Sequence, residues 1–353
     1  MNVINTNINA KKCPGYDLIT AGILKELPRK ALVKLTNLIN AAIRIKVVPT
    51  LWKIAEIIMI PKPGKPPHLT SSYRPISLLP VISKLFEKLL IKRLMPIIER
   101  KKLIPNHQFG FRAQHSTIEQ VHRITNTIEK ALEEKKVCST IFLDVAQAFD
   151  KVWHEGLNHK LRTLLPVQYA KILESYLKGR FFRIKLEDAY SGLKEIRAGV
   201  PQGSVLGPVL YLLYTNDLPS LEHNTVATFA DDTAILAVGK SNEESTQSLQ
   251  SAITEIYNWT KRWRIKLNES KSVHINFTNK QTAHIPVFIN EVIIPHANTA
   301  KYLGMTLDAK LRWKAHVKKK REELGLKYRK MYWLIGRNSV LSTYNKLLLY
   351  KQI

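Results

Sequence analysis

The chain has 353 residues, 45% of them hydrophobic, and its 55 Lys and Arg residues against 28 Asp and Glu residues give a formal net charge of +27. This length exceeds one average domain and predicts two or three lobes with ample core. The basic excess predicts a polyanionic partner such as nucleic acid, with an ordinary lysine-rich surface as the alternative. The two cysteines, Cys13 and Cys138, are too few for a disulfide framework or a zinc cluster, and the eleven histidines show no metal-ligand spacing.

The charge is concentrated at the two ends of the chain. Residues 1–100 carry +12 (17 minus 5), residues 101–300 carry +4 (24 minus 20) and residues 301–353 carry +11 (14 minus 3). This distribution predicts basic flanking lobes that grip a polyanion and a centre that holds acidic residues for a metal.

The sequence also indicates a cellular compartment. The first twelve residues lack the regions of a signal peptide, and no apolar run approaches 18 residues, so we expect no membrane association. The low cysteine content predicts a reduced, intracellular protein of the nucleus, the cytoplasm or both. The KKKR stretch at residues 318–321 fits either a nuclear import signal or a basic helix face.

The first hundred residues predict helices around one strand and a lysine-bearing loop. Residues 17–47 have helical periodicity broken by Pro28, and residues 53–60 form an apolar strand. Prolines then force a loop with Lys62 and Lys65, which suits a triphosphate clamp or a solvated turn. Arg74 precedes a proline and is expected to be extended, and residues 81–98 predict a helix with one basic face.

A loop at residues 107–117 leads into a helix at about Ser116. It contains Phe109, Phe111 and Arg112, a mixture that suits stacking and phosphate contact with a template strand. A loop that plugs the core is the alternative, and composition does not separate the two.

Residues 139–145 predict a buried strand that ends in an acid. Asp144 falls at the strand end, and a helix-like pattern follows through Phe149, Val152, Trp153 and Leu157. An unpaired acid is costly at a buried strand end, which favours a role for Asp144.

The next predicted elements are a helix at residues 168–178, strands at 181–186 and 194–198, and a buried helix at 209–218. Between the last two lies a glycine-rich loop with Gln202 and Gly203, where the backbone can approach a ligand closely. Such loops also occur as plain turns.

Residues 225–238 predict a hairpin with Asp231 and Asp232 at its tip. Adjacent acids repel each other and raise each other's pKa unless a cation neutralises them. Taken alone, such a pair is more often a solvated hairpin tip. If the hairpin pairs with the strand that ends at Asp144, the three carboxylates converge as hard oxygen ligands for two Mg²⁺ ions, with Mn²⁺ as an alternative. Two such ions serve in-line displacement at phosphorus, which indicates nucleotidyl transfer.

The remaining chain predicts an amphipathic helix at residues 243–264, a turn with Lys271, strands at 287–294 and 301–308, and a basic helical segment. The expected inner face of that last segment consists of Trp313, Val317, Leu324 and Tyr328.

With these motifs in hand, the chain resembles the reverse transcriptases of non-LTR retrotransposons, most like the jockey-type elements of insects. The resemblance runs from KKCPGYDLI at residue 11 to the C-terminus, with the motifs in family order. It implies an α+β right-hand polymerase fold, with an antiparallel palm sheet backed by helices. The implied fingers cover residues 1–137 and part of 166–200, the palm covers 138–165 and 201–300, and the primer grip and a truncated thumb cover 301–353.

The resemblance also implies residue roles. Asp144, Asp231 and Asp232 match the metal-binding triad, and Phe149 matches the aromatic gate that selects deoxynucleotides. Lys271 looks like the general acid for the leaving pyrophosphate. The residues matching the nucleotide-binding set are Lys62, Lys65, Arg74, Gln202 and Gly203. The matching template or primer contacts are Phe109, Phe111, Arg112, Tyr302, Leu303 and Gly304.

The implied activity is RNA-directed DNA polymerisation, with template RNA, a DNA primer or nicked target DNA, and deoxynucleoside triphosphates as partners. Family members usually carry an endonuclease before this region and further sequence after it, so we expect a clipped thumb that holds a duplex poorly. Two alternatives are a degenerate or domesticated copy that only binds RNA and a group II intron maturase, which would need a domain beyond the thumb.

Overall fold

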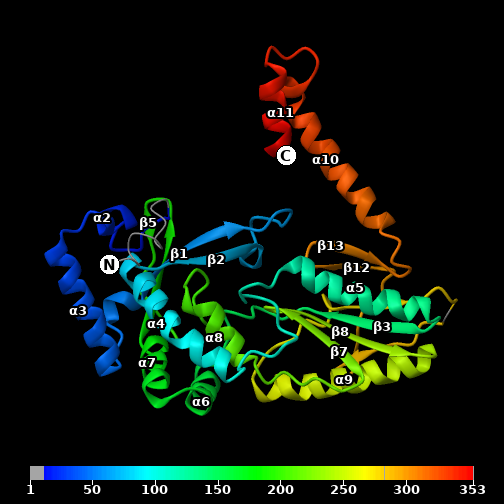
Figure 1. Cartoon of the computed structure of the whole chain (residues 1–353), viewed down its shortest axis with the longest axis horizontal. Helices are drawn as coiled ribbons and strands as arrows, with labels where there is room; N and C mark the ends of the chain where they lie inside the picture. Colours follow the sequence, from blue (N-terminus) through cyan, green and yellow to red (C-terminus); the bar gives the residue numbers. More distant parts are fainter. Residues whose placement is uncertain (1–11, 282, 353) are drawn as a thin grey trace.

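The computed structural model describes residues 12–281 and 283–352 and shows two lobes side by side with a helical arm projecting from one of them (Figure 1). The first eleven residues of the expected fingers therefore lie outside the described residues. Each lobe is built on one larger sheet, of five strands in the first lobe and four in the second, and two two-stranded sheets pack near the second.

The sheet of the first lobe has the strand order β2-β1-β4-β5, with β6 also paired to β4. Its β1 pairs antiparallel with β2 and parallel with β4, so this sheet is mixed. The strands are β1 (Ile54–Pro61), β2 (Tyr73–Leu78), β4 (Arg180–Leu186), β5 (Ala189–Tyr190) and β6 (Lys194–Ile196). Two short 3₁₀ turns precede strands, at Thr50–Lys53 and Thr70–Ser72.

Helices lie beside this sheet, and prolines precede the starts of two of them. The helices are α2 (Ala21–Lys25), α3 (Arg29–Ile45), α4 (Val81–Arg100) and α7 (Val167–Leu177). Pro28 precedes α3 and Pro80 precedes α4, positions that suit proline, although α4 also continues through Pro96.

The second lobe contains a four-stranded antiparallel sheet with the order β7-β8-β3-β9. Every residue of the central β3 is buried, which explains its unbroken apolar run. The strands are β3 (Val137–Leu143), β7 (Asn224–Phe229), β8 (Asp232–Gly239) and β9 (Val273–Phe277). This is the sheet expected for a palm.

One helix covers each face of this sheet (Figure 1). The first, α5 (Thr117–Glu133), begins at a capping box in which Ser116 and Glu119 satisfy each other's backbone amides. The second, α9 (Asn242–Arg262), packs Leu249, Ile253 and Ile256 onto the opposite face.

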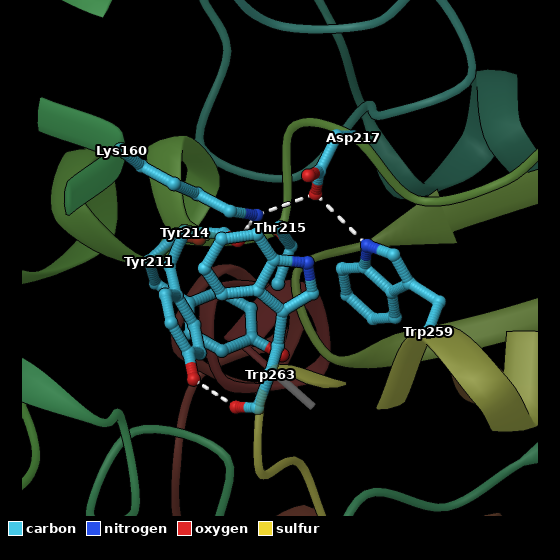
Figure 2. Close-up of polar contacts among 7 residues, drawn as sticks. All are labelled: Lys160, Tyr211, Tyr214, Thr215, Asp217, Trp259 and Trp263. Atoms are coloured by element: carbon cyan, nitrogen blue, oxygen red, sulfur yellow. Dashed lines mark hydrogen bonds and ion pairs between the residues drawn. The ribbon is translucent and has the colours of Figure 1, made fainter. Parts of the chain in front are cut away.

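Two further helices, α6 (His154–Leu164) and α8 (Leu206–Tyr214), pack on each other, and both contribute to the core that also contains α4 and α7. Lys160 joins them to α9: its ammonium donates to the Tyr214 carbonyl and the Asp217 carboxylate and lies 3.7 Å from the centre of the Trp263 ring (Figure 2). Trp259 Nε1 donates to the same carboxylate at 2.9 Å. A charge on a buried lysine is tolerated because it is paired and hydrogen-bonded.

Two hairpins and an arm complete the described chain. The hairpins are β10 (Phe288–Ile289) with β11 (Val292–Ile293), and β12 (Thr299–Tyr302) with β13 (Met305–Asp308). The arm consists of α10 (Lys314–Ile335), which runs away from the palm lobe, and α11 (Thr343–Gln352), which folds back beside the far end of α10 (Figure 1).

Two expectations for helices are wrong. Val317, Leu324 and Tyr328 were expected to face inward, yet they are 61%, 53% and 50% exposed and α10 has no buried residue; Trp313 alone packs against the palm core. The projecting helix has no opposing surface to cover these side chains. The helix after Asp144 begins only at His154, so Phe149 lies in a turn.

Among the described residues, no helix combines the length and the apolar character needed to cross a bilayer.

Candidate active site

Asp144 lies where β3 leaves the palm sheet, and the loop before β9 holds it there. Its backbone amide donates to Ser272 Oγ at 3.1 Å, and its carbonyl accepts from the Asn268 amide at 2.8 Å. The preceding residue, Leu143, pairs with Thr233 in β8. The side chain of Asp144 therefore emerges beside the start of β8.

Asp231 and Asp232 occupy the tip of the β7–β8 hairpin, where Phe229 pairs with Asp232. Gln108 fixes this turn, since its Oε1 accepts from the amides of Ala230 at 2.9 Å and Gly110 at 2.8 Å. A Cβ at Gly110 would lie 2.2 Å from the Ala230 nitrogen, so only glycine allows this close approach. The loop at 108–110 thus determines where the two acids point.

The three carboxylates act on one another electrostatically. Partial loss of water, and then the charges of Asp231 and Asp144, together raise the pKa of Asp232 to about 6. Burial and Asp144 also raise the pKa of Asp231. This is the state expected of converging acids that lack a counterion, and three carboxylates supply the hard oxygen ligands that suit Mg²⁺.

A cleft of about 900 Å³ opens beside Asp144 and Asp231 and is lined by residues of both lobes. Its wall includes Asp144, Asp231, Lys271 and most of the residues expected to bind a nucleotide. These are Lys62, Arg74, Phe149, Gln202 and Gly203. Lys65 is the exception, because it lies on the exposed loop after β1 and does not line the cleft.

Phe149 projects into the cleft from the turn after β3. Its ring stacks on Tyr211 of α8, with centroids 4.7 Å apart and planes at 22°, and meets Phe111 edge-on at 6.0 Å. Contacts on two sides restrict the rotamers of Phe149, so the ring forms a fixed part of the cleft wall.

Gln202 and Gly203 form the floor of the cleft where the loop before α8 meets β2. The Gln202 carbonyl accepts from the Ser77 amide at 2.8 Å, and its side chain donates to Asp150 at 3.1 Å. Gly203 has φ of +108°, and a Cβ there would lie 2.7 Å from the Ser77 oxygen. The expected loop beneath a nucleotide is thus clamped between the two lobes.

The basic groups on the cleft differ in how firmly they are held. Lys271 Nζ lies 3.9 Å from Asp144 Oδ2, and both side chains are largely solvated. Lys62 Nζ donates to the Ser71 carbonyl at 2.8 Å, whereas Arg74 is exposed on β2. Lys271 and Arg74 are therefore free to meet an anionic ligand.

The expected template and primer contacts divide into two groups. Phe111 is 52% exposed beside the cleft, whereas Phe109 packs on His115. Arg112 donates to the carbonyls of Pro105 at 3.2 Å and Gln108 at 3.1 Å, so its guanidinium supports its own loop here.

The β12–β13 turn consists of Leu303 and Gly304, both with positive φ. Tyr302 is buried against Phe142 and donates to the Ala227 carbonyl at 3.3 Å, so it anchors this hairpin to the palm.

Sequence reasoning missed four residues that position the site: Gln108, Gly110, Asp150 and Ser272. Burial raises the pKa of Asp150, and Gln202 and Lys62 lower it. The sequence offered two signals: Gly110 lies between two phenylalanines, and Asp150 is a second acid close to Asp144.

Comparison with known proteins agrees with this geometry. Residues 60–307 match the family described as reverse transcriptase (RNA-dependent DNA polymerase). The chain is 45% identical over 347 residues to a probable RNA-directed DNA polymerase from transposon X-element of Drosophila melanogaster. It is 40% identical over 351 residues to the RNA-directed DNA polymerase from mobile element jockey of the same fly. Each alignment covers 97% of this chain and 38% of the relative, so the chain spans about two fifths of these relatives' length.

Among solved structures, apo telomerase from Candida tropicalis, truncated from its C-terminal domain, superposes with a TM-score of 0.50 at 16% identity. The match covers 87% of this chain and 63% of the telomerase chain. At this identity the likeness concerns the fold alone. The expected right-hand fold and the expected resemblance to jockey-type non-LTR elements are both confirmed.

Proposed function

The chain belongs to the reverse transcriptase family, and we propose that it is an RNA-directed DNA polymerase that copies retrotransposon RNA into DNA. Its fingers are residues 12–137 with part of 166–200, its palm is 138–165 and 201–300, and its primer grip and thumb are 301–352. This division is supported by the described fold, because the five-stranded sheet falls in the fingers and the four-stranded sheet falls in the palm, apart from Val137 at the start of β3.

The observation that carries the proposal is that Asp144 and Asp231 line the cleft and that Asp232 lies next to them at the hairpin tip. The raised pKa of Asp232 indicates that these acids need a cation. We assign Asp144, Asp231 and Asp232 as the groups that hold two Mg²⁺ ions, with Mn²⁺ as a substitute. When bound, the ions lower the pKa of the primer hydroxyl and neutralise charge on the nucleotide phosphates.

The other cleft residues bind and orient the deoxynucleoside triphosphate. Arg74 and Lys62 neutralise its phosphates, with Lys65 reaching in from its exposed loop. Gln202 and Gly203 support it from below, and Phe149 occupies the space that a ribose 2′-hydroxyl would need. Lys271, beside Asp144, donates a proton to the leaving pyrophosphate.

The template RNA and the DNA primer lie between the palm and the basic arm. Helix α10 carries eight basic and two acidic residues, a net +6, and has no buried residue. Phe111 lines the cleft, and we assign it to the template and the Leu303–Gly304 turn to the primer. We place the protein in the nucleus, the cytoplasm or both.

Asp231→Asn tests this function directly, because it removes a metal ligand and leaves the basic surfaces unchanged. Primer extension on poly(rA) with oligo(dT) and Mg²⁺ should fall by at least about 100-fold, since even changes outside the ligand sphere cost about 10–100-fold in metal affinity or activity. Filter binding of the same preparation should remain near wild type. Near wild-type extension by the variant would exclude Asp231, and no extension by the wild-type chain would favour an RNA-binding protein without catalysis.

A further inference from the structure

Three histidines far from the carboxylates meet at the edge of the palm sheet. They come from three segments: His274 from β9, His284 from the loop after it, and His296 from the chain after β11. One ring nitrogen of each lies within 4.8 Å of those of the other two, and the rings of His284 and His296 lie 4.2 Å apart. The spacing of the histidines in the sequence did not predict this arrangement, which the fold creates.

His274 is held in one orientation by its neighbours. It has no exposed surface, and its Nε2 lies 2.8 Å from Ser139 Oγ of β3. Its other nitrogen, Nδ1, is buried and has no hydrogen-bond partner of ordinary geometry in the described part of the chain. A proton on Nε2 donated to the serine would leave the Nδ1 lone pair free, which is how metal-binding histidines are commonly oriented.

The backbone brings the other two histidines to the His274 ring. The His274 amide donates to the Pro295 carbonyl at 2.9 Å, and the Ala297 amide donates to the His274 carbonyl at 3.0 Å, so residues 295–297 extend the edge of the sheet. The β10–β11 segment before them is tied to α9, because Gln250 bonds both backbone groups of Phe288. The three rings therefore lie together where the segment that follows β9 returns to the edge of the sheet at residue 296.

The protonation state of the cluster also suits a metal. Burial, and then His296 and His284, together lower the pKa of His274 to about 4, against a smaller opposing effect of Asn276. Burial and then His284 lower the pKa of His296. Metal binding requires neutral imidazole, so no proton needs to be displaced from these two rings near neutral pH.

We propose that His274, His284 and His296 form a site for a divalent transition metal, best fitted by Zn²⁺, that fastens residues 284–296 to the edge strand of the palm. Imidazole nitrogens suit zinc, whereas the carboxylates of the cleft suit Mg²⁺, so the two sites are chemically distinct. Tetrahedral Zn²⁺ with bonds of about 2.0–2.1 Å needs ligand nitrogens about 3.3 Å apart, so the rings must close by roughly 1 Å or slightly more. His284 and His296 are exposed and free to make this movement, and water takes the fourth position.

A metal-free alternative exists. Asn276 is close to His274 on β9, and its buried Oδ1 also lacks a partner. A small rotation of the Asn276 side chain would let this oxygen accept from His274 Nδ1 in the tautomer that carries its proton there. Nδ1 would then have no lone pair for a metal. The experiment must therefore detect the metal itself.

The test is calorimetric titration of the metal-stripped full chain with ZnCl₂ in saturating Mg²⁺, which occupies the carboxylates. We expect one zinc per chain and a higher melting temperature when it is bound. His284→Asn and His296→Asn should each weaken binding by at least about 100-fold, and Ser139→Ala by about 10–100-fold. The first two positions are exposed, so these variants should fold normally.

His223→Asn is the matched control, because His223 is an exposed histidine outside the cluster, and it should bind zinc as the wild type does. Co²⁺ gives an independent readout: the visible absorption of a tetrahedral complex should appear with the wild type and disappear in the His284→Asn/His296→Asn variant. Absence of stoichiometric zinc binding by the wild type, or equal binding by the cluster variants, would overturn the proposal.

Discussion

The palm and the arm use apolar residues in opposite ways. In the palm, both faces of β3 are covered, and residues such as Ile141 and Ile253 have 0% and 1% of their surface exposed. In α10, apolar residues recur among lysines and arginines, yet none is buried. A helical pattern of apolar residues therefore predicts a helix but not its burial, because burial needs an opposing surface that the local sequence does not describe.

The difference separates the two tasks that we propose for the molecule. Catalysis needs carboxylates held in fixed positions, and the palm supplies a packed sheet whose strand ends carry them. Grip on a long polyanion needs many exposed charges and little fixed geometry, and the arm supplies these. Each prediction below tests one side of this contrast.

The largest predicted effect is the difference in stability loss between truncating a palm core residue and truncating an arm residue of similar size. Ile253→Ala should destabilise the protein by about 2–5 kcal/mol, because it leaves a cavity between α9 and the sheet. Leu324→Ala, at a position 53% exposed, should stay within about 0.5 kcal/mol. The melting temperature should fall by about 4–20 °C in Ile253→Ala and by at most about 2 °C in Leu324→Ala. Equal losses would mean that the arm packs against the rest of the protein in solution.

The second effect concerns nucleotide choice in the cleft. Phe149→Ala should lower the preference for deoxynucleotides by about 1–3 kcal/mol, a factor of roughly 5–150 in the ratio of kcat/KM values, because it vacates the space proposed for the 2′-hydroxyl. Phe109→Ala is the control, since Phe109 packs on His115 and does not line the cleft. An unchanged ratio in Phe149→Ala would assign the gate to another residue.

The third effect is on pH dependence. The pKa of Asp232 is about 6 in the folded chain, above its usual value of 3.8, so between these values the folded state holds a proton that the unfolded state has lost. Without metal, the stability contributed by this group is present below about pH 4 and is lost as the pH rises to about 6. Mg²⁺ binding has the opposite dependence, because it requires the carboxylate. Its affinity should fall by up to about tenfold for each pH unit below 6.

Mg²⁺ titrations of primer extension between pH 5 and 7 would measure the pH dependence of Mg²⁺ affinity. Unfolding of the metal-free wild type and of Asp232→Asn would measure the pH dependence of stability. The substitution should remove the pH-dependent stability term. Mg²⁺ affinity that is flat across this range would show that Asp232 is already ionised there.

Local sequence patterns predicted the palm elements well, for physical reasons. The run before Asp144 is apolar throughout because β3 is central, and the acids at 231–232 interrupt an apolar hairpin because they lie at its tip. Contacts between distant segments were not predictable in this way. Gln108 reaches the hairpin tip across 122 residues, and the three histidines have no regular spacing, so both arrangements depend on the whole fold.

The smallest effect should come from a single charge in the arm. Lys319 is exposed on α10 within the run of basic residues at 318–321. If its ammonium meets one phosphate of a template–primer duplex, Lys319→Gln should reduce the magnitude of the slope of log K against log salt by about 0.9. Lys46→Gln, on the far lobe, should leave the slope unchanged, and neither substitution should alter the melting temperature. Filter binding across a range of KCl concentrations would measure both slopes. A slope unaffected by Lys319→Gln, and equally unaffected by the same change at Lys318, would mean that the duplex does not lie along this face of the arm and that α10 contributes charge only at long range.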